Sequence, residues 1–200
     1  MDRLHALVAL AVLAAGCEKS GGGGEPSTDE GTGRVNAVET VQKKPVTVAE
    51  FCDVHADAAS APVIAWPALA PGQTAPAKGT WRWVNLWATW CHPCVEEMPL
   101  LARWREALGA QGVKYDNVFL SVDESEELIT RFRASHPQTP ASLRIASADA
   151  LPDWLTALGV PGAPIPVHIF LDPEDRVRCV RAGAVKESDQ PAVKSVLGGG

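Results

Sequence analysis

A pair of cysteines separated by two residues, Cys91-His92-Pro93-Cys94, places the strongest constraint on the fold of this chain. Residues 83–88 (WVNLWA), just before the pair, form a short apolar run rich in β-formers, which predicts a buried strand. Residues 94–108 carry apolar side chains at helical spacing with charges on the other face, which predicts an amphipathic helix. The cysteine pair is therefore expected at a strand-to-helix junction, with Cys91 at the helix start.

This position favours thiolate chemistry at Cys91. The first backbone N–H groups of a helix have no partner inside the helix, and the helix dipole is positive there, so both stabilise a negative sulfur. Cysteines of C-x-x-C motifs commonly have a pKa lowered from about 8.5 to about 3.5–7.5. We expect Cys91 to attack a disulfide and Cys94, one turn along and more buried, to resolve the mixed disulfide.

The two residues between the cysteines are expected to modify this chemistry. Pro93 falls in the first helical turn, where its missing N–H costs nothing. His92 is expected to be exposed, and it either favours the thiolate when protonated or has little effect. We expect no cofactor, and no metal either, because a structural zinc site requires two close Cys/His pairs and Cys52 and Cys179 are isolated.

The rest of the chain predicts a mixed sheet. Strands alternate with helices through the middle, and two strands follow each other near the end, which implies parallel βαβ units closed by an antiparallel hairpin. The Pro- and Ala-rich segment 61–80 is less informative, and we expect a strand or hairpin within residues 63–69. The other expected strands are 118–122, 142–146, 167–171 and 176–182, and the other expected helices are 126–135, 151–158 and 188–197.

The N-terminus resembles an export signal. A short polar start with Arg3 precedes the apolar run 6–15, which is too short for a membrane-spanning helix of about 20 residues. The small residues before Cys17 resemble a bacterial lipoprotein signal, although an ordinary signal peptide is the alternative. We expect a signal peptide at 1–16, a lipid anchor on Cys17 with a flexible Gly-rich linker at 17–45, and a folded domain at 46–200.

The cysteine count suggests a second disulfide. The chain has five cysteines; if Cys17 carries lipid and the C-x-x-C forms one pair, Cys52 and Cys179 remain. In an exported protein an even remainder suggests a bridge, and the alternative is two buried free thiols.

Overall charge limits the choice of partners. The formal net charge is −6 and the pI is about 5.4, without the clustered basic face that nucleic-acid binding requires. We therefore expect no nucleic-acid partner.

Residues 84–94 (VNLWATWCHPC), followed by Glu96-Glu97-Met98-Pro99, resemble the active-site block of the thioredoxin superfamily. They are most similar to its exported branch, the membrane-anchored thiol reductases of the TlpA/ResA/CcmG kind. The resemblance spans about residues 60–185 and implies an α/β, thioredoxin-like three-layer fold with a central mixed sheet flanked by helices. It also implies that Trp90, His92 and Pro93 contact the substrate.

Residues 162–172 resemble the loop that faces the cysteine pair in this family. The resemblance implies a cis-proline at Pro166, with Pro164 as a nearby competitor. Ile165 would then offer backbone groups to an extended substrate. His168 stands where the family usually has Thr, and we expect a structural rather than a catalytic role for it.

Two further positions bear on proton transfer. Asn85 stands where thioredoxins carry a buried Asp, and it cannot take up a proton. Glu97 lies three residues after Cys94 on the same helix face, and the resemblance implies that it accepts a proton near the buried thiol. The alternative for Glu97 is a solvated helix charge.

The resemblance implies a membrane-anchored thiol–disulfide oxidoreductase in the bacterial cell envelope, facing the periplasm. It would reduce protein disulfides and take electrons from a membrane donor. Two other functions remain open: a thiol peroxidase of the same fold, although the proline typical of its Cys motif is absent, and a non-catalytic anchored binding module.

Overall fold

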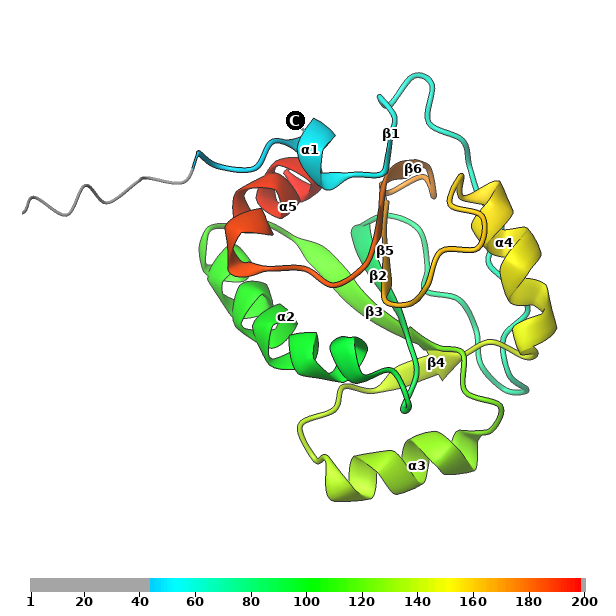
Figure 1. The fold of residues 1–200 in the computed structure, drawn as a ribbon. Helices are drawn as coiled ribbons and strands as arrows, with labels where there is room; N and C mark the ends of the chain where they lie inside the picture. The colour runs from blue at the N-terminus through cyan, green and yellow to red at the C-terminus, as the bar shows by residue number, and fades with distance from the viewer. Residues whose placement is uncertain (1–43, 199–200) are drawn as a thin grey trace, which may run out of the picture. The chain divides into compact units, whose positions relative to one another are not determined.

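The structure is a computed structural model that describes residues 44–198, and every structural statement below concerns these residues. Six strands form one sheet in the order β1-β6-β5-β2-β3-β4 (Figure 1). Their bounds are β1 Val54–His55, β2 Trp81–Trp87, β3 Tyr115–Ser121, β4 Ser142–Arg144, β5 Val167–Leu171 and β6 Val177–Ala182.

The sheet is mixed, as the alternation of strands and helices predicts. β2, β3 and β4 run parallel, with Val84 opposite Val118. β5 runs antiparallel to both β2 and β6, and β6 runs antiparallel to β1. The expected hairpin near the C-terminus is therefore confirmed, and the short β1 adds one more strand beside it.

Helices flank the sheet on both sides, so the expectation of a three-layer α/β fold with a central mixed sheet is confirmed. In Figure 1, α1, α2 and α5 lie on one side of the sheet and α4 lies on the other. The α-helices are α1 Val48–Phe51, α2 His92–Ala110, α3 Glu126–Ser135, α4 Leu151–Ala157 and α5 Gln190–Leu197, with 3-10 turns at Ala148–Ala150 and Glu187–Asp189.

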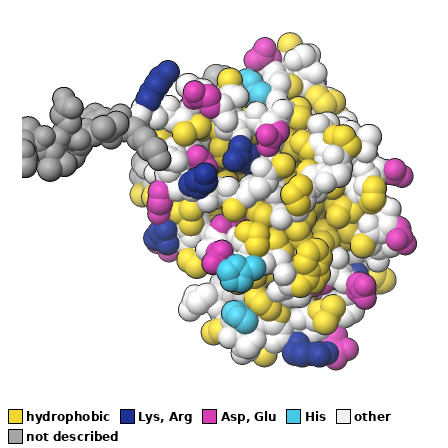
Figure 2. Space-filling view, in the orientation of Figure 1, with side chains coloured by type: hydrophobic (Ala, Val, Ile, Leu, Met, Phe, Trp, Pro, Cys, Tyr) yellow, Lys and Arg dark blue, Asp and Glu magenta, His cyan; other side chains and the backbone are white. Residues whose placement is uncertain are grey.

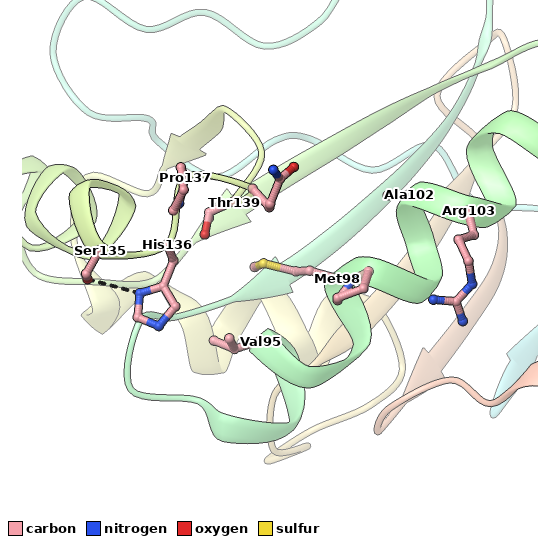
Figure 3. Close-up of a pocket in the computed structure, with 10 residues that line it drawn as sticks. Val95, Met98, Ala102, Arg103, Ser135, His136, Pro137 and Thr139 are labelled. Carbon is pink, nitrogen blue, oxygen red and sulfur yellow. Dashed lines mark hydrogen bonds between the residues drawn. The ribbon is translucent and has the colours of Figure 1, made fainter. Parts of the chain in front are cut away.

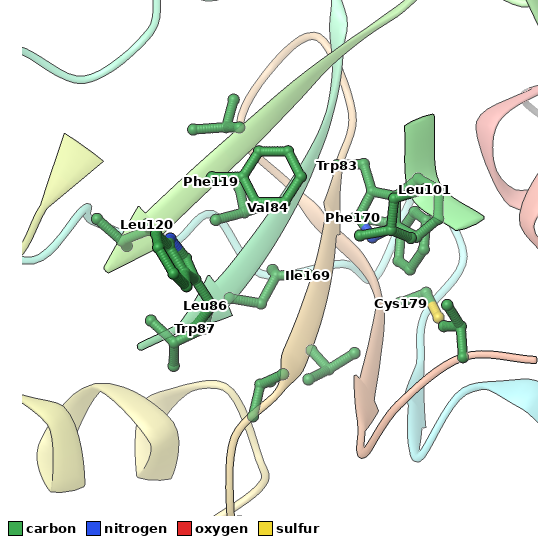
Figure 4. Close-up of a cluster of buried hydrophobic side chains, with 14 of the residues drawn as sticks. Trp83, Val84, Leu86, Trp87, Leu101, Phe119, Leu120, Ile169, Phe170 and Cys179 are labelled. Atoms are coloured by element: carbon green, nitrogen blue, oxygen red, sulfur yellow. The ribbon is translucent and has the colours of Figure 1, made fainter. Parts of the chain in front are cut away.

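Large aromatic side chains fill the core between β2, β5 and α2 (Figure 4). The Trp83 ring stacks on Phe170 with a centroid separation of 5.0 Å, and it lies 6.1 Å from the Trp104 ring of α2. On the opposite face, Val84 and Ile169 are also buried. β2 is thus covered on both faces, which makes the strand before the cysteine pair a rigid base for the site.

Strand β2 begins two residues earlier than its apolar pattern predicts, because a buried arginine lies within it. The Arg82 side chain is fully buried, forms an ion pair with Asp175 and donates a hydrogen bond of 2.7 Å to the Asp172 carbonyl oxygen. A charge that is paired in this way can lie inside a sheet. A single sequence does not reveal this partner, and the apolar run that predicted the strand began only at Trp83.

The expected strand or hairpin at 63–69 is wrong. The segment makes only isolated bridges, Val63 with Arg176 and Leu69 with Ile145. Pro62 and Pro67 lack the N–H groups that a continuous ladder requires. Conversely, α1 and β1 were not expected, because elements of two to four residues carry almost no periodicity.

None of the helices in residues 44–198 has the length and apolar character that a membrane span requires. The expected signal peptide 1–16 and Cys17 lie outside the described residues, as does most of the expected linker.

Candidate functional site

The cysteine pair lies where β2 passes into α2. Cys91 is the N-cap residue of α2 and is bonded to Cys94 in a disulfide. Cys91 is 5% exposed and Cys94 is fully buried, so only the first sulfur has any contact with solvent. Because Pro93 has no N–H, His92 and Cys94 supply the free N–H groups of the first turn, which point toward the Cys91 side of the helix end.

A loop from a distant part of the chain faces Cys91. The Ile165–Pro166 peptide bond is cis, whereas Pro164 is not in a cis bond. The Ile165 carbonyl oxygen lies 3.7 Å from the Cys91 Sγ atom. Ile165 and Pro166 thus lie beside the first sulfur, and an extended substrate that reached Cys91 would pass this backbone.

The expected substrate-contact residues surround the pair at the surface. The Trp90 side chain is 69% exposed, which is unusual for an indole. His92 and Pro93 are also exposed, and His92 Nδ1 lies 3.2 Å from Glu96 Oε2. Both groups of this i,i+4 pair are solvated, so it contributes little to stability.

Trp90 borders a shallow groove formed with α3. The groove has a volume of about 310 Å³ and is lined by Thr89, Trp90, Leu128, Arg131, Phe132 and Ser135. Leu128 is a further exposed large apolar residue. The groove therefore combines three apolar side chains with two hydroxyls and one basic side chain. Figure 2 shows that hydrophobic side chains gather on one face of the molecule.

A larger cavity of about 560 Å³ lies further along α2 (Figure 3). Val95 and Met98 of α2 line one side, and His136 and Thr139, after α3, line the other. Its walls include Val95, the neighbour of Cys94 in the chain, but neither cysteine.

A buried aspartate holds the turn before Cys91, and this residue was missed by sequence reasoning. Asp123 accepts hydrogen bonds from the Thr89 backbone N–H at 3.0 Å and from the Thr89 hydroxyl at 2.7 Å. It also accepts one from the Ser121 hydroxyl at 2.7 Å. The available signal was a carboxylate directly after the buried strand β3, at the edge of the sheet where the cysteine pair lies.

Glu97 is buried, at 4% exposure, so the alternative of a solvated helix charge is wrong. Its Oε1 atom accepts a hydrogen bond of 2.7 Å from Asn85 Nδ2, and its Oε2 atom accepts one of 3.0 Å from the Val185 N–H. His168, on β5, is fully buried and places Nε2 3.3 Å from Glu97 Oε2. Sequence reasoning proposed Glu97 and noted Asn85 and His168, but it did not connect the three.

Cys52 and Cys179 are bonded to each other in the structure. The bridge joins the residue that ends α1 to β6, across a sequence separation of 127. It does not contribute to the surface around Cys91. The bridge links the N-terminal part of the described chain covalently to the sheet.

The described chain has a thioredoxin-like fold with a redox-active pair of cysteines. Three features together define it: the sheet order, the cis-proline loop and a C-x-x-C disulfide at a helix N-terminus.

No protein-family model matches the chain. Among curated proteins, the chain is 32% identical over 112 residues to the thiol-disulfide oxidoreductase ResA of Bacillus subtilis (strain 168). The match covers 56% of this chain and 58% of that relative, which is less than two thirds of its length.

Solved structures support the fold. The thioredoxin domain of a thiol-disulfide oxidoreductase from Bacteroides vulgatus is 19% identical with a TM-score of 0.53, and the match covers 72% of this chain and 99% of that one. A thioredoxin-related protein from Neisseria meningitidis serogroup B is 24% identical with a TM-score of 0.50, and the match covers 65% and 96%. At these identities the likeness establishes the fold and not the substrate.

Proposed function

We propose that this chain is a thiol–disulfide oxidoreductase that reduces protein disulfides with Cys91 and Cys94. The observation that carries the proposal is the position of the Cys91 sulfur. It lies at the N-terminus of α2, in the more exposed of the two cysteines at 5% exposure, and 3.7 Å from the Ile165 carbonyl oxygen. The similarity to ResA supports the same activity.

The reaction starts from the dithiol form. The Cys91 thiolate attacks one sulfur of a client disulfide, and the other client sulfur leaves and takes up a proton. Cys94 then loses its proton and attacks Cys91 Sγ, which restores the Cys91–Cys94 disulfide and releases the second client thiol. Two electrons pass from the cysteine pair to the client, and a dithiol donor must supply two electrons for the next cycle.

Glu97 is the proposed acceptor of the Cys94 proton. Both side chains are buried and lie three residues apart on one face of α2. A buried thiol has no solvent to take its proton, so a neighbouring carboxylate is the natural acceptor. In this proposal Glu97 holds the proton until the site opens to solvent or to the leaving client thiol.

The proposal places the domain at the bacterial cell envelope, facing the periplasm. Its support is the apolar segment 6–15, followed by Cys17 and a Gly-rich stretch. Lipid on Cys17 would hold the domain near a membrane, where a membrane electron donor could reduce it and protein clients could reach it.

An insulin-reduction assay tests the activity. The wild type is expected to reduce insulin with dithiothreitol as electron donor, and Cys91→Ser is expected to be inactive. Cys52→Ala/Cys179→Ala is the matched control, because it removes the other two described cysteines and should keep activity. No activity in the wild type would support a binding module instead, and turnover of peroxide alone would support a peroxidase.

The direction of electron flow is tested by the reduction potential of the pair. A reductase is expected near the value of thioredoxin, about −270 mV, whereas an oxidant such as DsbA lies near about −120 mV. Equilibration with glutathione and thioredoxin, followed by thiol trapping, measures it. A value near that of DsbA would contradict the proposed direction.

The anchor is tested separately in living bacteria. Wild-type protein is expected to incorporate labelled palmitate and to sediment with membranes. Cys17→Ser should lose the label. Unlabelled wild-type protein released into the periplasm would contradict the anchor without affecting the proposed chemistry.

A further inference from the structure

We infer that His168 is a positioning residue for Glu97, held by Trp83 and Asn85 in the neutral tautomer that carries its proton on Nε2. The inference rests on the proposed function, because it assigns His168 to the proton transfer of Cys94. Its structural basis is a fully buried imidazole whose two nitrogens face different kinds of partner.

The Nδ1 side of His168 faces hydrogen-bond donors. Trp83 Nε1 lies 3.2 Å away and Asn85 Nδ2 lies 3.4 Å away. An indole N–H can only donate. The orientation of the Asn85 amide is supported by its other contact, 2.7 Å to the carboxylate of Glu97, which requires a donor. Nδ1 therefore accepts, and in a neutral ring the proton must be on Nε2.

The Nε2 side faces Glu97. Nε2 is buried, lies 3.3 Å from Glu97 Oε2 and has no aligned hydrogen-bond partner with the cysteine pair oxidised. A small movement of the carboxylate would therefore let Glu97 Oε2 accept a hydrogen bond from Nε2. Within residues 44–198, no other hydrogen bond or ion pair reaches this nitrogen.

These contacts leave one acceptor site on Glu97. A carboxylate has about four lone-pair sites. Asn85 occupies one site on Oε1, and the Val185 N–H occupies one on Oε2. His168 Nε2 lies 3.3 Å from Oε2 without an aligned hydrogen bond, and once its proton turns to the second site of Oε2 the free site is on Oε1. We assign this site to the proton of Cys94.

The contacts of His168 fit this tautomer. Glu97 from α2 lies 3.3 Å from Nε2, and Arg181 lies opposite His168 across the β5–β6 pair and shares its face of the sheet. A second N–H, on Nδ1, would point at the donors of Trp83 and Asn85. In this inference the Nε2 proton stays on His168 while the proton of Cys94 moves to Glu97 and back.

The test measures the reactivity of Cys94 in a Cys91→Ser background, which does not depend on catalysis. His168→Leu removes both ring nitrogens, and His168→Gln keeps an N–H that can reach Glu97. We expect His168→Leu to slow the alkylation of Cys94 about tenfold near neutral pH and to displace the pH profile of that reaction. His168→Gln should restore most of the lost alkylation rate. An unchanged profile in folded His168→Leu would overturn the inference and leave His168 a packing residue.

A double-mutant cycle with Glu97→Gln separates positioning from general destabilisation. If His168 acts through Glu97, His168→Leu should have no further effect on Cys94 alkylation once Glu97 is replaced. Additive effects would overturn the inference. If His168→Leu does not fold, NMR of ring nitrogens in the oxidised wild type decides, since a proton on Nδ1 would equally overturn it.

Failure of the proposed function has a different signature. Wild-type protein that does not reduce insulin would contradict the proposed activity. The tautomer and the Cys94 alkylation profile would still report whether His168 positions Glu97.

Discussion

Asp123 accepts two hydrogen bonds from Thr89, one from the backbone N–H at 3.0 Å and one from the hydroxyl at 2.7 Å. Thr89 lies in the turn that leads to Cys91, and Asp123 follows the neighbouring parallel strand β3. The pair therefore connects the ends of two strands at the edge of the sheet where the cysteines lie. The position of Cys91 depends on this connection as well as on α2.

Replacing Asp123 should loosen the site and lower stability. Asp123→Ala leaves the buried donors of Thr89 and Ser121 without their acceptor, which should cost about 1–3 kcal/mol. Urea unfolding of the oxidised protein measures the loss, and insulin reduction should fall as well. Glu124→Ala is the matched control, because Glu124 is the exposed neighbouring carboxylate. Equal stability of the two variants would contradict the prediction.

Trp90 should affect protein clients and not the chemistry of the pair. Because its side chain is 69% exposed, Trp90→Ala should change stability by less than about 0.5 kcal/mol. If Trp90 is a hot spot for client binding, its loss should cost more than about 1 kcal/mol, so kcat/KM for insulin should fall about fivefold or more. Reduction of a small aromatic disulfide should stay the same.

Val63→Ala provides the control for Trp90→Ala, because Val63 is also exposed but lies in the segment before β2, away from the groove. Both variants should fold as the wild type does. Equal losses on insulin and on the small disulfide in Trp90→Ala would show that the indole acts on the sulfurs themselves.

Cys94→Ser should trap clients. The first attack by Cys91 remains possible, but the mixed disulfide cannot be resolved, so it should accumulate. Non-reducing electrophoresis followed by mass spectrometry of the bands identifies the client. Cys91→Ser should trap nothing, since its remaining sulfur is fully buried and a protein client, unlike a small alkylating reagent, cannot reach it. Equal trapping by both variants would contradict the division of roles.

The Cys52–Cys179 bridge should stabilise the domain. For a sequence separation of 127, the chain-entropy model gives an upper value of about 5 kcal/mol, and native bridges typically contribute 2–5 kcal/mol. Cys52→Ala/Cys179→Ala should therefore unfold at a markedly lower urea concentration and still reduce insulin. Unchanged stability would mean that the bridge adds nothing beyond the packing of α1 and β6.

Tyr115 should make the domain sensitive to alkali. Burial raises the pKa of Tyr115 to about 12, and the nearby Arg105 charge opposes this only in part. Since an unfolded tyrosine ionises at about 10, the unfolded state loses a proton first, and stability should fall between about pH 10 and pH 12. Tyr115→Phe should lose less stability over this range. Parallel pH curves for both proteins would contradict the assignment.

The sequence alone predicted the cysteine pair at the centre of the site and the class of fold. A C-x-x-C between an apolar strand and an amphipathic helix is a local pattern, and local patterns depend only on neighbouring residues. The helix at 126–135 and the strand at 167–171 are confirmed with the bounds expected. The strand or hairpin expected at 63–69 was wrong, because Pro62 and Pro67 lack the N–H groups of a continuous ladder and the segment makes only isolated bridges.

Only the tertiary structure revealed the buried polar groups that serve the site. Asp123, His168 and Arg82 are polar residues that a sequence pattern assigns to the surface or leaves unexplained, yet each is buried beside a specific partner. Their partners lie 34, 71 and 93 positions away, at Thr89, Glu97 and Asp175. A buried polar group is tolerated only where such a partner meets it. The sequence by itself therefore determined where the sulfurs lie, and the packing of distant strands decided what surrounds them.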